Sequence, residues 1–274
     1  YSSNYKSNKR GQNISLNFIS ASLVGMIFSY YFGLFLDTNG SQFHFLFLGM
    51  GLFAFLASMA LFLIPSTQVK RTESSSKLFG GLIFILKDRL FGKMLFAWML
   101  MGLGVIMTVP LRIEYMVGQG GVGMSNEQVA YVVILYSLSG VLTSRVWGKL
   151  FDRVSFVPYR LSLNVLLFSS VLIFFSSESF LGLAIGSSLA GVANGGASIA
   201  WSLWVTKLAP AGLESEYMGA HVFMTGIRGA CAPFLGYFIL SNLGFEGMAY
   251  FSCCLILASG IIFLTALKSP RMIV

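Results

Sequence analysis

Long apolar stretches, each followed by a short polar segment, run along almost the whole chain. About 20 mainly apolar residues are needed to cross the hydrocarbon core of a bilayer as a helix. Because lipid offers no partners to backbone polar groups, such segments must be helical. Eight stretches are long enough to span: Ile14–Leu36, Phe43–Ile64, Leu95–Tyr115, Val129–Val146, Phe156–Phe175, Leu181–Val205, Tyr217–Leu240 and Gly247–Leu267. The predicted fold class is therefore an all-α polytopic membrane protein with eight transmembrane helices.

The composition of the chain supports this class. Its 274 residues are 56% hydrophobic and only 10% charged, whereas soluble domains carry about 25% charged residues. The three cysteines, Cys231, Cys253 and Cys254, lie within apolar stretches and have neither a disulfide nor a metal-ligand spacing. We expect no metal site, and no cofactor is expected either. The chain begins at Tyr1 and its first methionine is Met26, a pattern typical of a fragment or a processed product.

Basic residues lie mainly at the ends of the chain and in alternate loops. A net charge of +8 would also suit a nucleic-acid partner, but charges placed between apolar stretches indicate membrane topology instead. Sixteen of the 18 basic residues fall on one predicted side: Lys6, Lys9, Arg10, Lys70, Arg71, Lys77, Lys87, Arg89, Lys93, Arg145, Lys149, Arg153, Arg160, Lys207, Lys268 and Arg271. Since basic loops stay in the cytoplasm, both termini are predicted to be cytoplasmic, in a multi-pass protein of the cell (inner) membrane.

A polar linker divides the predicted spans into two groups. The segment STQVKRTESSSK, rich in serine, threonine and lysine, follows the second span. The apolar stretch Leu78–Leu86 is too short to cross a bilayer, and the basic residues around it favour an interfacial helix. We therefore predict three parts: residues 1–65 with two spans, residues 66–90 with the linker and the interfacial helix, and residues 91–274 with six spans.

The segment RVWGKLFDRVSF, between the fourth and fifth spans, resembles the loop signature of major facilitator superfamily transporters. Gly148, Asp152 and Arg153 match that signature, a glycine followed four residues later by Asp-Arg. Members of this family have two bundles of six helices, joined by a long cytoplasmic linker, with the substrate between them. The resemblance implies that residues 1–65 supply the last two helices of the N-terminal bundle. It implies equally that residues 91–274 are a complete six-helix C-terminal bundle.

The three signature residues also have a physical interpretation of their own, as a cytoplasmic gate motif. Gly148 permits close backbone approach where two helices meet. Asp152 can accept hydrogen bonds from the N-terminus of a neighbouring helix and so favour a closed cytoplasmic side. The family resemblance implies that this neighbour is the first span, entered by Arg10. Arg153 completes the motif. The alternative is a solvated turn whose charges only set the topology.

Arg228 is a permanent cation inside the apolar stretch HVFMTGIRGACAPFLGYFIL. It lies 11 residues after Tyr217, which places it roughly 17 Å into the span and near the bilayer midplane. A central arginine costs about 2.5–3.5 kcal/mol even by the lower estimates, so it is expected to face protein or water. No Asp or Glu lies in the middle of a predicted span. Arg228 is therefore a candidate for binding an anionic substrate group or for a charge switch. A permanent ion pair or a carbonyl clamp is the structural alternative.

Three further residues are candidates for the same site. His221, on the helix of Arg228, can relay protons because its reference pKa is near neutrality, although a hydrogen bond to a neighbouring helix is the more ordinary role. Asn194 and Trp201, in a span rich in small residues, can line a cavity. Trp201 and Trp204 are also interpreted as anchors at the membrane interface.

Two pairs of residues concern helix packing and the outer mouth. Gly191 and Gly195 are four residues apart and favour close packing of their helix. Arg112 and Glu114 lie two residues apart at the end of the third span, so they do not face each other on a helix. They are candidates for pairing across helices at an outer mouth, with ordinary boundary charges as the alternative.

These features favour a secondary active transporter that moves a small organic solute by alternating access, with proton coupling left open. Its expected partners are the lipid bilayer and a solute, preferably anionic or amphipathic because of Arg228 and the aromatic content. An intramembrane enzyme is disfavoured, because the chain has two histidines, no buried acid pair and no G-x-S-x-G motif. A channel would need a filter motif or a charge ring, and neither is present. The remaining alternative is a truncated or non-transporting membrane subunit without a complete cavity.

Overall fold

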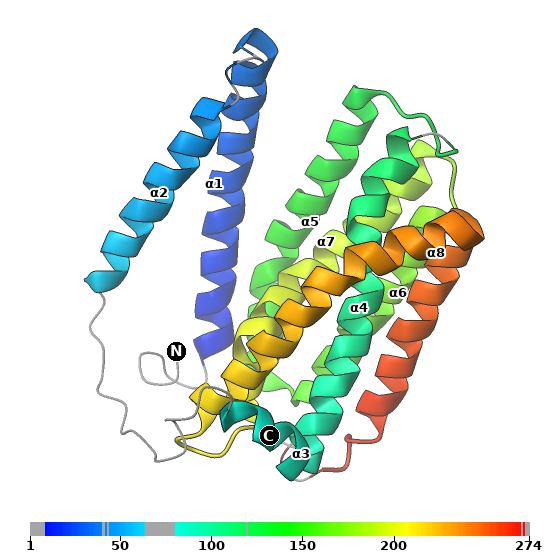
Figure 1. The fold of residues 1–274 in the computed structure, drawn as a ribbon. Coiled ribbons are helices and arrows are strands. Elements are labelled where there is room, and N and C mark those ends of the chain that lie inside the picture. The colour runs from blue at the N-terminus through cyan, green and yellow to red at the C-terminus, as the bar shows by residue number, and fades with distance from the viewer. Residues whose placement is uncertain are drawn as a thin grey trace. The chain divides into compact units, whose positions relative to one another are not determined.

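The computed structural model describes residues 9–39, 42, 44–63, 80–118, 120–269 and 271. Within this part of the chain, every regular element is a helix (Figure 1). In order, the elements are α1 (Arg10–Asn39), α2 (His44–Phe62), η4 (Gly80–Leu82), α3 (Ile83–Lys87), α4 (Arg89–Val117), α5 (Asn126–Arg153), α6 (Phe156–Phe175), α7 (Phe180–Leu203), η5 (Trp204–Lys207) and α8 (Glu214–Leu264).

Among the described residues, six helices are long and apolar enough to cross a membrane, namely α2, α4, α5, α6, α7 and α8. The last of these has 51 residues but is interrupted at Gly244, whose φ of 69° and ψ of −177° are not helical. At this point α8 reverses direction (Figure 1). Its first segment contains the predicted span Tyr217–Leu240, and its second covers Gly247–Leu267 except for the last three residues, which follow the end of α8 at Leu264. The 30-residue α1 contains Ile14–Leu36. The total of eight membrane crossings stays a prediction.

The chain divides into two compact units. The first comprises Tyr1–Phe18 and Thr72–Val274, and within it α4 packs on α8, α5 packs on α7, and α6 packs on both α7 and α8. The second unit comprises Ile19–Arg71. There, Phe28 of α1 contacts Phe53 of α2 edge to face, and α2 has no buried residue. Most of the predicted linker falls on residues 64–79, outside the described residues; Gly80–Lys87 is helical.

Polar residues just before the helices set where the helices begin. The side chain of Asp88 accepts a hydrogen bond from the Phe91 amide (3.1 Å) at the start of α4. Ser125 and Gln128 form a reciprocal capping box at the start of α5. Such caps satisfy amide groups that have no partner within the helix. The cap at Asp88 fixes the first turn of α4, the helix that contributes most to the site below.

Glycines bring α5 and α7 into backbone contact. A Cβ atom added at Gly191 would overlap the Tyr136 carbonyl oxygen, and one at Gly195 would lie 2.8 Å from the Gly140 carbonyl oxygen. Any larger residue at these positions would therefore separate the two helices. The close packing predicted for Gly191 and Gly195 is confirmed.

Candidate functional site

The first unit contains a cavity of about 540 Å³. It is lined by residues from all five long helices of that unit, α4 to α8. Three of the lining residues were predicted as solute ligands: Asn194, Trp201 and Arg228. Most of the wall is apolar, and the polar or charged lining residues are Thr108, Arg112, Tyr136, Arg160, Ser187, Asn194, Ser198 and Arg228.

Arg228 reaches from α8 to the backbone of α4. Its Nη1 atom donates a hydrogen bond to the Trp98 carbonyl oxygen (3.2 Å). The guanidinium lies against Gly102, where a Cβ atom would overlap it. Its Nε atom is buried and has no hydrogen-bond partner among the described residues. The carbonyl clamp considered from the sequence is thus present, but it provides a hydrogen-bond acceptor for Nη1 and none for Nε.

Arg160 is a second cavity cation, and its placement corrects the sequence analysis, which counted it with the loop before α6. It lies inside α6, is 0% exposed and lines the cavity. Its guanidinium carbon is 4.2 Å from the centroid of the Trp98 ring. None of its three guanidinium nitrogens has a hydrogen-bond partner within the described part of the chain. A buried charge with a cation–π contact alone is incompletely stabilised.

Arg112 is a third cation in the same cavity, not a member of a paired cluster with Glu114. Its Nη2 atom donates to Ser170 Oγ (2.8 Å), and its guanidinium carbon lies 4.5 Å from the centroid of the Phe174 ring. Glu114 lines a separate pocket of about 610 Å³, together with Glu178 and Glu246. In the described residues, neither Arg112 nor Glu114 takes part in an ion pair.

The charged residues that line the cavity are all positive. Three arginines line it, and none of its described lining residues is Asp or Glu. Three glutamates of the first unit, Glu114, Glu178 and Glu246, line the separate pocket instead. Since the cationic groups share a largely apolar enclosure, their field is weakly screened and favours an anion.

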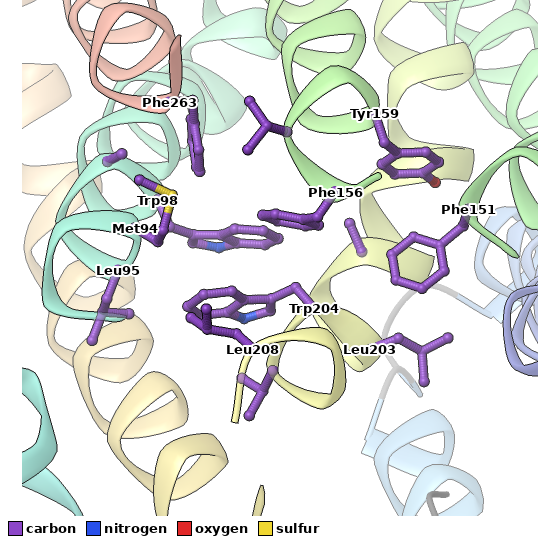
Figure 2. Close-up of a cluster of buried hydrophobic side chains, with 14 of the residues drawn as sticks. Met94, Leu95, Trp98, Phe151, Phe156, Tyr159, Leu203, Trp204, Leu208 and Phe263 are labelled. Carbon is purple, nitrogen blue, oxygen red and sulfur yellow. The ribbon is translucent and has the colours of Figure 1, made fainter. Parts of the chain in front are cut away.

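The Trp98 ring, which contacts Arg160, belongs to a column of stacked aromatic rings, and Figure 2 shows its Trp98 and Trp204 rings. The Trp98 ring stacks on the Trp204 ring at 5.3 Å with an interplanar angle of 16°, and the Trp204 ring stacks on Phe91 at 5.6 Å. Trp204 is 1% exposed, so its interpretation as an interface anchor was wrong. The column makes Trp98 a rigid platform for the guanidinium of Arg160.

His221 lies beside this column and not in the cavity wall. Its ring contacts the rings of Trp98, Trp201 and Trp204, with centroids 5.3 to 5.8 Å apart. Neither of its ring nitrogens has a hydrogen-bond partner among the described residues. The hydrogen bond expected to a neighbouring helix is therefore not present there, and aromatic contacts take its place.

The gate motif lies where α5 ends and α1 begins, both within the first unit. Asp152 accepts hydrogen bonds from the amides of Gly11 (2.8 Å) and Gln12 (3.2 Å), as expected for a carboxylate at a helix N-terminus. A Cβ atom at Gly148 would lie 2.8 Å from the Gly11 carbonyl oxygen, so the two backbones touch. The next residue, Arg153, is in the last turn of α5. The carboxylate therefore fastens the first turn of α1 to α5.

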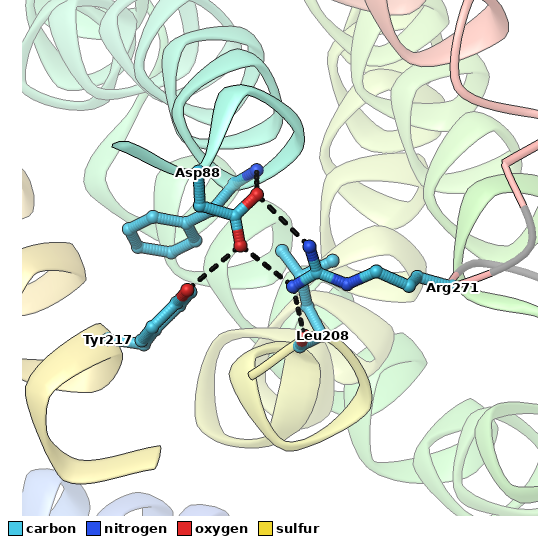
Figure 3. Close-up of polar contacts among 5 residues, drawn as sticks. Asp88, Leu208, Tyr217 and Arg271 are labelled. Atoms are coloured by element: carbon cyan, nitrogen blue, oxygen red, sulfur yellow. Dashed lines mark hydrogen bonds and ion pairs between the residues drawn. The ribbon is translucent and has the colours of Figure 1, made fainter. Parts of the chain in front are cut away.

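A second polar cluster fixes the end of the first unit where α4 and α8 begin, here called the α3 end (Figure 3). Asp88 receives two hydrogen bonds from Arg271 (2.8 and 3.1 Å) and one from the Tyr217 hydroxyl (2.9 Å). Arg271 also donates to the Leu208 carbonyl oxygen (2.7 Å). Burial raises the pKa of Asp88, but the hydrogen bonds from Arg271, Phe91 and Tyr217 and the charge of Arg271 outweigh it and lower that pKa below its usual value.

Sequence reasoning found Arg228 but missed Arg160, Trp98 and Gly102. A signal for Arg160 was available, because it lies four residues after Phe156, inside a predicted span. The residues Trp98, Gly102, Val105 and Arg112 recur at helical spacing along one face of α4, and all of them line the cavity. Nothing in the sequence, however, tells which face of an all-round apolar helix points inward.

These observations define the protein's class: a multi-pass helical membrane protein whose interior cavity carries cations in an apolar wall. The sequence profile of the Major Facilitator Superfamily matches residues 119–272, more than half of the chain. The chain therefore belongs to the major facilitator superfamily, a family of small-solute transporters. The resemblance noted at Gly148, Asp152 and Arg153 is confirmed at the level of the family. A comparison with curated proteins finds no match.

Proposed function

We propose that this protein is a secondary active transporter that moves a small organic anion across the membrane by alternating access. One observation carries this proposal: a cavity of about 540 Å³ holds Arg112, Arg160 and Arg228, with no Asp or Glu among its described lining residues. Buried arginines need an anion to offset their lost hydration. A solute carboxylate or phosphate would provide it, and the apolar wall would hold the rest of the solute.

The contact between Asp152 and the start of α1 supports alternating access. A carboxylate on two amides of a helix N-terminus is a charge–dipole contact that can be made in one state and broken in another. The backbones of Gly11 and Gly148 also touch, so the start of α1 must move away from α5 as a whole for this contact to open. Gly148, Asp152 and Arg153 would then stabilise the state that is closed at the α3 end.

The distribution of charge supports a cytoplasmic position for the α3 end. Lys207 lies there, and its Nζ atom donates to the carbonyl oxygens of Phe151 (2.7 Å) and Val154 (3.0 Å) at the end of α5. Glu114, Glu178 and Glu246 line one pocket together. Basic residues remain on the cytoplasmic side, so both termini would be cytoplasmic and the three glutamates would face outward, in the cell (inner) membrane.

Proton coupling has weaker support from the residues described. His221 is enclosed by three tryptophan rings and does not line the cavity. We propose for it a supporting role, holding the aromatic column against α8. Asn194 and Trp201, which line the cavity on α7, would contact the uncharged part of the solute.

The test is uptake by the full chain in proteoliposomes, with labelled organic anions, cations and neutral solutes presented in parallel. We expect uptake of anions, lost in Arg228→Gln and retained in Arg145→Gln, an exposed arginine that does not line the cavity. Unchanged uptake kinetics in Arg228→Gln would show that Arg228 does not bind the substrate. Absence of uptake of every solute would instead favour a non-transporting subunit.

A further inference from the structure

Two of the cavity arginines meet at one residue, Trp98. Arg160 lies over the Trp98 ring, with its guanidinium carbon 4.2 Å from the ring centroid. Arg228 donates to the Trp98 carbonyl oxygen at 3.2 Å. Together they keep four guanidinium nitrogens buried without a hydrogen-bond partner in the described part of the chain, three on Arg160 and one on Arg228. Because Arg160 and Arg228 also line the cavity, this end is where an anionic group would meet unpaired donors.

Arg112 makes a separate cationic end. It lies ten residues after Gly102 on α4, and its partner Ser170 lies ten residues after Arg160 on α6. At 1.5 Å per residue, each helix places this end roughly 15 Å from the Trp98 end. The Ser170 hydroxyl donates to the Gly186 carbonyl oxygen (2.7 Å), so its oxygen is held in place to accept from Arg112. The Nη1 atom of Arg112 is buried and has no partner among the described residues.

The wall that α4 and α6 form between the two ends is mostly apolar. Its lining residues include Met101, Val105, Leu167 and Val171, and the hydroxyl of the polar Thr108 donates to the Val105 carbonyl oxygen of its own helix. A solute with its charge at one end would place an apolar tail beside Arg112 and leave that guanidinium only partly satisfied. A solute with an acidic group at each end would satisfy both cationic ends and lay its apolar middle along this wall.

We propose that the cavity binds an elongated organic dianion, with one acidic group between Arg160 and Arg228, the other at Arg112, and an apolar chain between them. This rests on the proposed transport function and specifies the substrate class of the same site. The two cationic ends lie roughly 15 Å apart and each offers its own guanidinium donors, so each acidic group contributes a separate set of contacts to binding. Loss of one end should therefore leave a weaker site that no longer distinguishes a dianion from a monoanion.

The test compares dodecanedioate, its monomethyl ester and succinate, binding to the purified full chain in lipid nanodiscs. Equilibrium dialysis with labelled compounds measures each dissociation constant. We expect dodecanedioate to bind at least tenfold more tightly than the monomethyl ester, which carries one negative charge on the same chain. Succinate, too short to reach both ends, should bind no better than the ester. Equal affinities for dodecanedioate and the ester would overturn the proposal without any variant, as would failure of dodecanedioate to bind.

Arg112→Gln then locates the second acidic group. In this variant dodecanedioate should bind as weakly as the ester, while the affinity of the ester stays within twofold of its wild-type value. Arg145→Gln, which removes an exposed arginine, should change neither value. If Arg112→Gln weakens the binding of dodecanedioate and of the ester equally, the second acidic group does not bind at Arg112. Dianion binding without uptake in proteoliposomes would contradict transport alone, whereas uptake of other solutes without dianion binding would contradict this inference alone.

Discussion

The guanidinium of Arg228 occupies the space that a side chain at Gly102 would take. A Cβ atom built at position 102 would overlap the guanidinium, and the Trp98 carbonyl oxygen that accepts from it lies one helical turn earlier on α4. Position 102 needs glycine because the Arg228 side chain approaches the backbone there. The reason is space for that side chain and not an unusual backbone conformation. The position of the Arg228 guanidinium therefore depends on a residue that has no side chain.

Gly102→Ala is therefore expected to displace Arg228 and to reduce anion uptake by at least tenfold, close to the effect of Arg228→Gln. The matched control is Gly226→Ala on α8, because a Cβ atom there meets nothing within 4 Å. Alanine is favoured over glycine in a helix by about 1 kcal/mol, so the control should be as stable as the wild type or more so. Equal uptake by the two variants, measured in proteoliposomes, would contradict this role of Gly102.

The platform beneath Arg160 leads to a second prediction. Trp98→Leu removes the ring that carries the guanidinium and leaves a void beside Trp204, which should cost roughly 3 kcal/mol of stability. Trp98→Phe keeps a π face and should retain most of the binding. The measurement is dodecanedioate affinity together with thermal unfolding in the same nanodiscs. If both variants bind alike, the aromatic face is not what positions Arg160.

How much of this could be predicted from the sequence differs from residue to residue. Arg228 was found because a cation in the middle of an apolar stretch is costly in a bilayer, whichever face of its helix points toward the lipid. Arg160 was missed because it lies only four residues after Phe156, where a charge suits a loop equally well. The general reason is that apolar length predicts a spanning helix, but its rotation about its own axis is set by packing. The positions of Gly102 against Arg228 and of Trp204 inside the aromatic column depend on that rotation, so the sequence alone does not predict them.

The gate motif shows the opposite case. The hydrogen bonds of Asp152 to a helix N-terminus were predicted, because a carboxylate there accepts from free amide groups, and the family resemblance implied that the helix is the first span. The conformational role of the contact stays a prediction. The linker between the second and third predicted spans falls mostly on residues outside those described, so that expectation is neither supported nor contradicted.

The cluster at the α3 end gives a prediction about pH. The pKa of Asp88 is lowered in the folded state, so its contribution to stability is present above the unfolded-state pKa of about 3.9 and is lost as the pH falls through the lower folded-state pKa. Asp88→Asn should lower stability by about 1 kcal/mol at pH 7, since asparagine still caps α4 but loses the partly exposed ion pair. Thermal unfolding from pH 8 to pH 3 should show a stability difference that stays constant down to about pH 4 and begins to shrink only below it. Arg271→Gln should behave in the same way, and a difference already vanishing at pH 6 would refute the assignment to Asp88.

The last prediction concerns the contact of α5 with the start of α1. Asp152→Ala removes the acceptor of the Gly11 and Gln12 amides, and loss of such a cap costs about 0.5–2 kcal/mol. The first turn of α1 should then leave α5 more often. Ser15 is a suitable reporter, because it is 0% exposed and its carbonyl oxygen accepts from Ser144 Oγ (3.3 Å).

The measurement is the rate at which a maleimide modifies Ser15→Cys, followed by mass spectrometry of the peptide that contains position 15. Asp152→Ala should raise that rate severalfold, because modification requires the contact to open. Lys149→Ala, a change of an exposed charged residue one turn earlier on α5, should leave the rate unchanged. If binding of dodecanedioate also changes the rate in the wild type, the cavity and this contact belong to one equilibrium, as alternating access requires. An unchanged rate in Asp152→Ala would mean that the touching backbones of Gly11 and Gly148 hold the contact without the carboxylate.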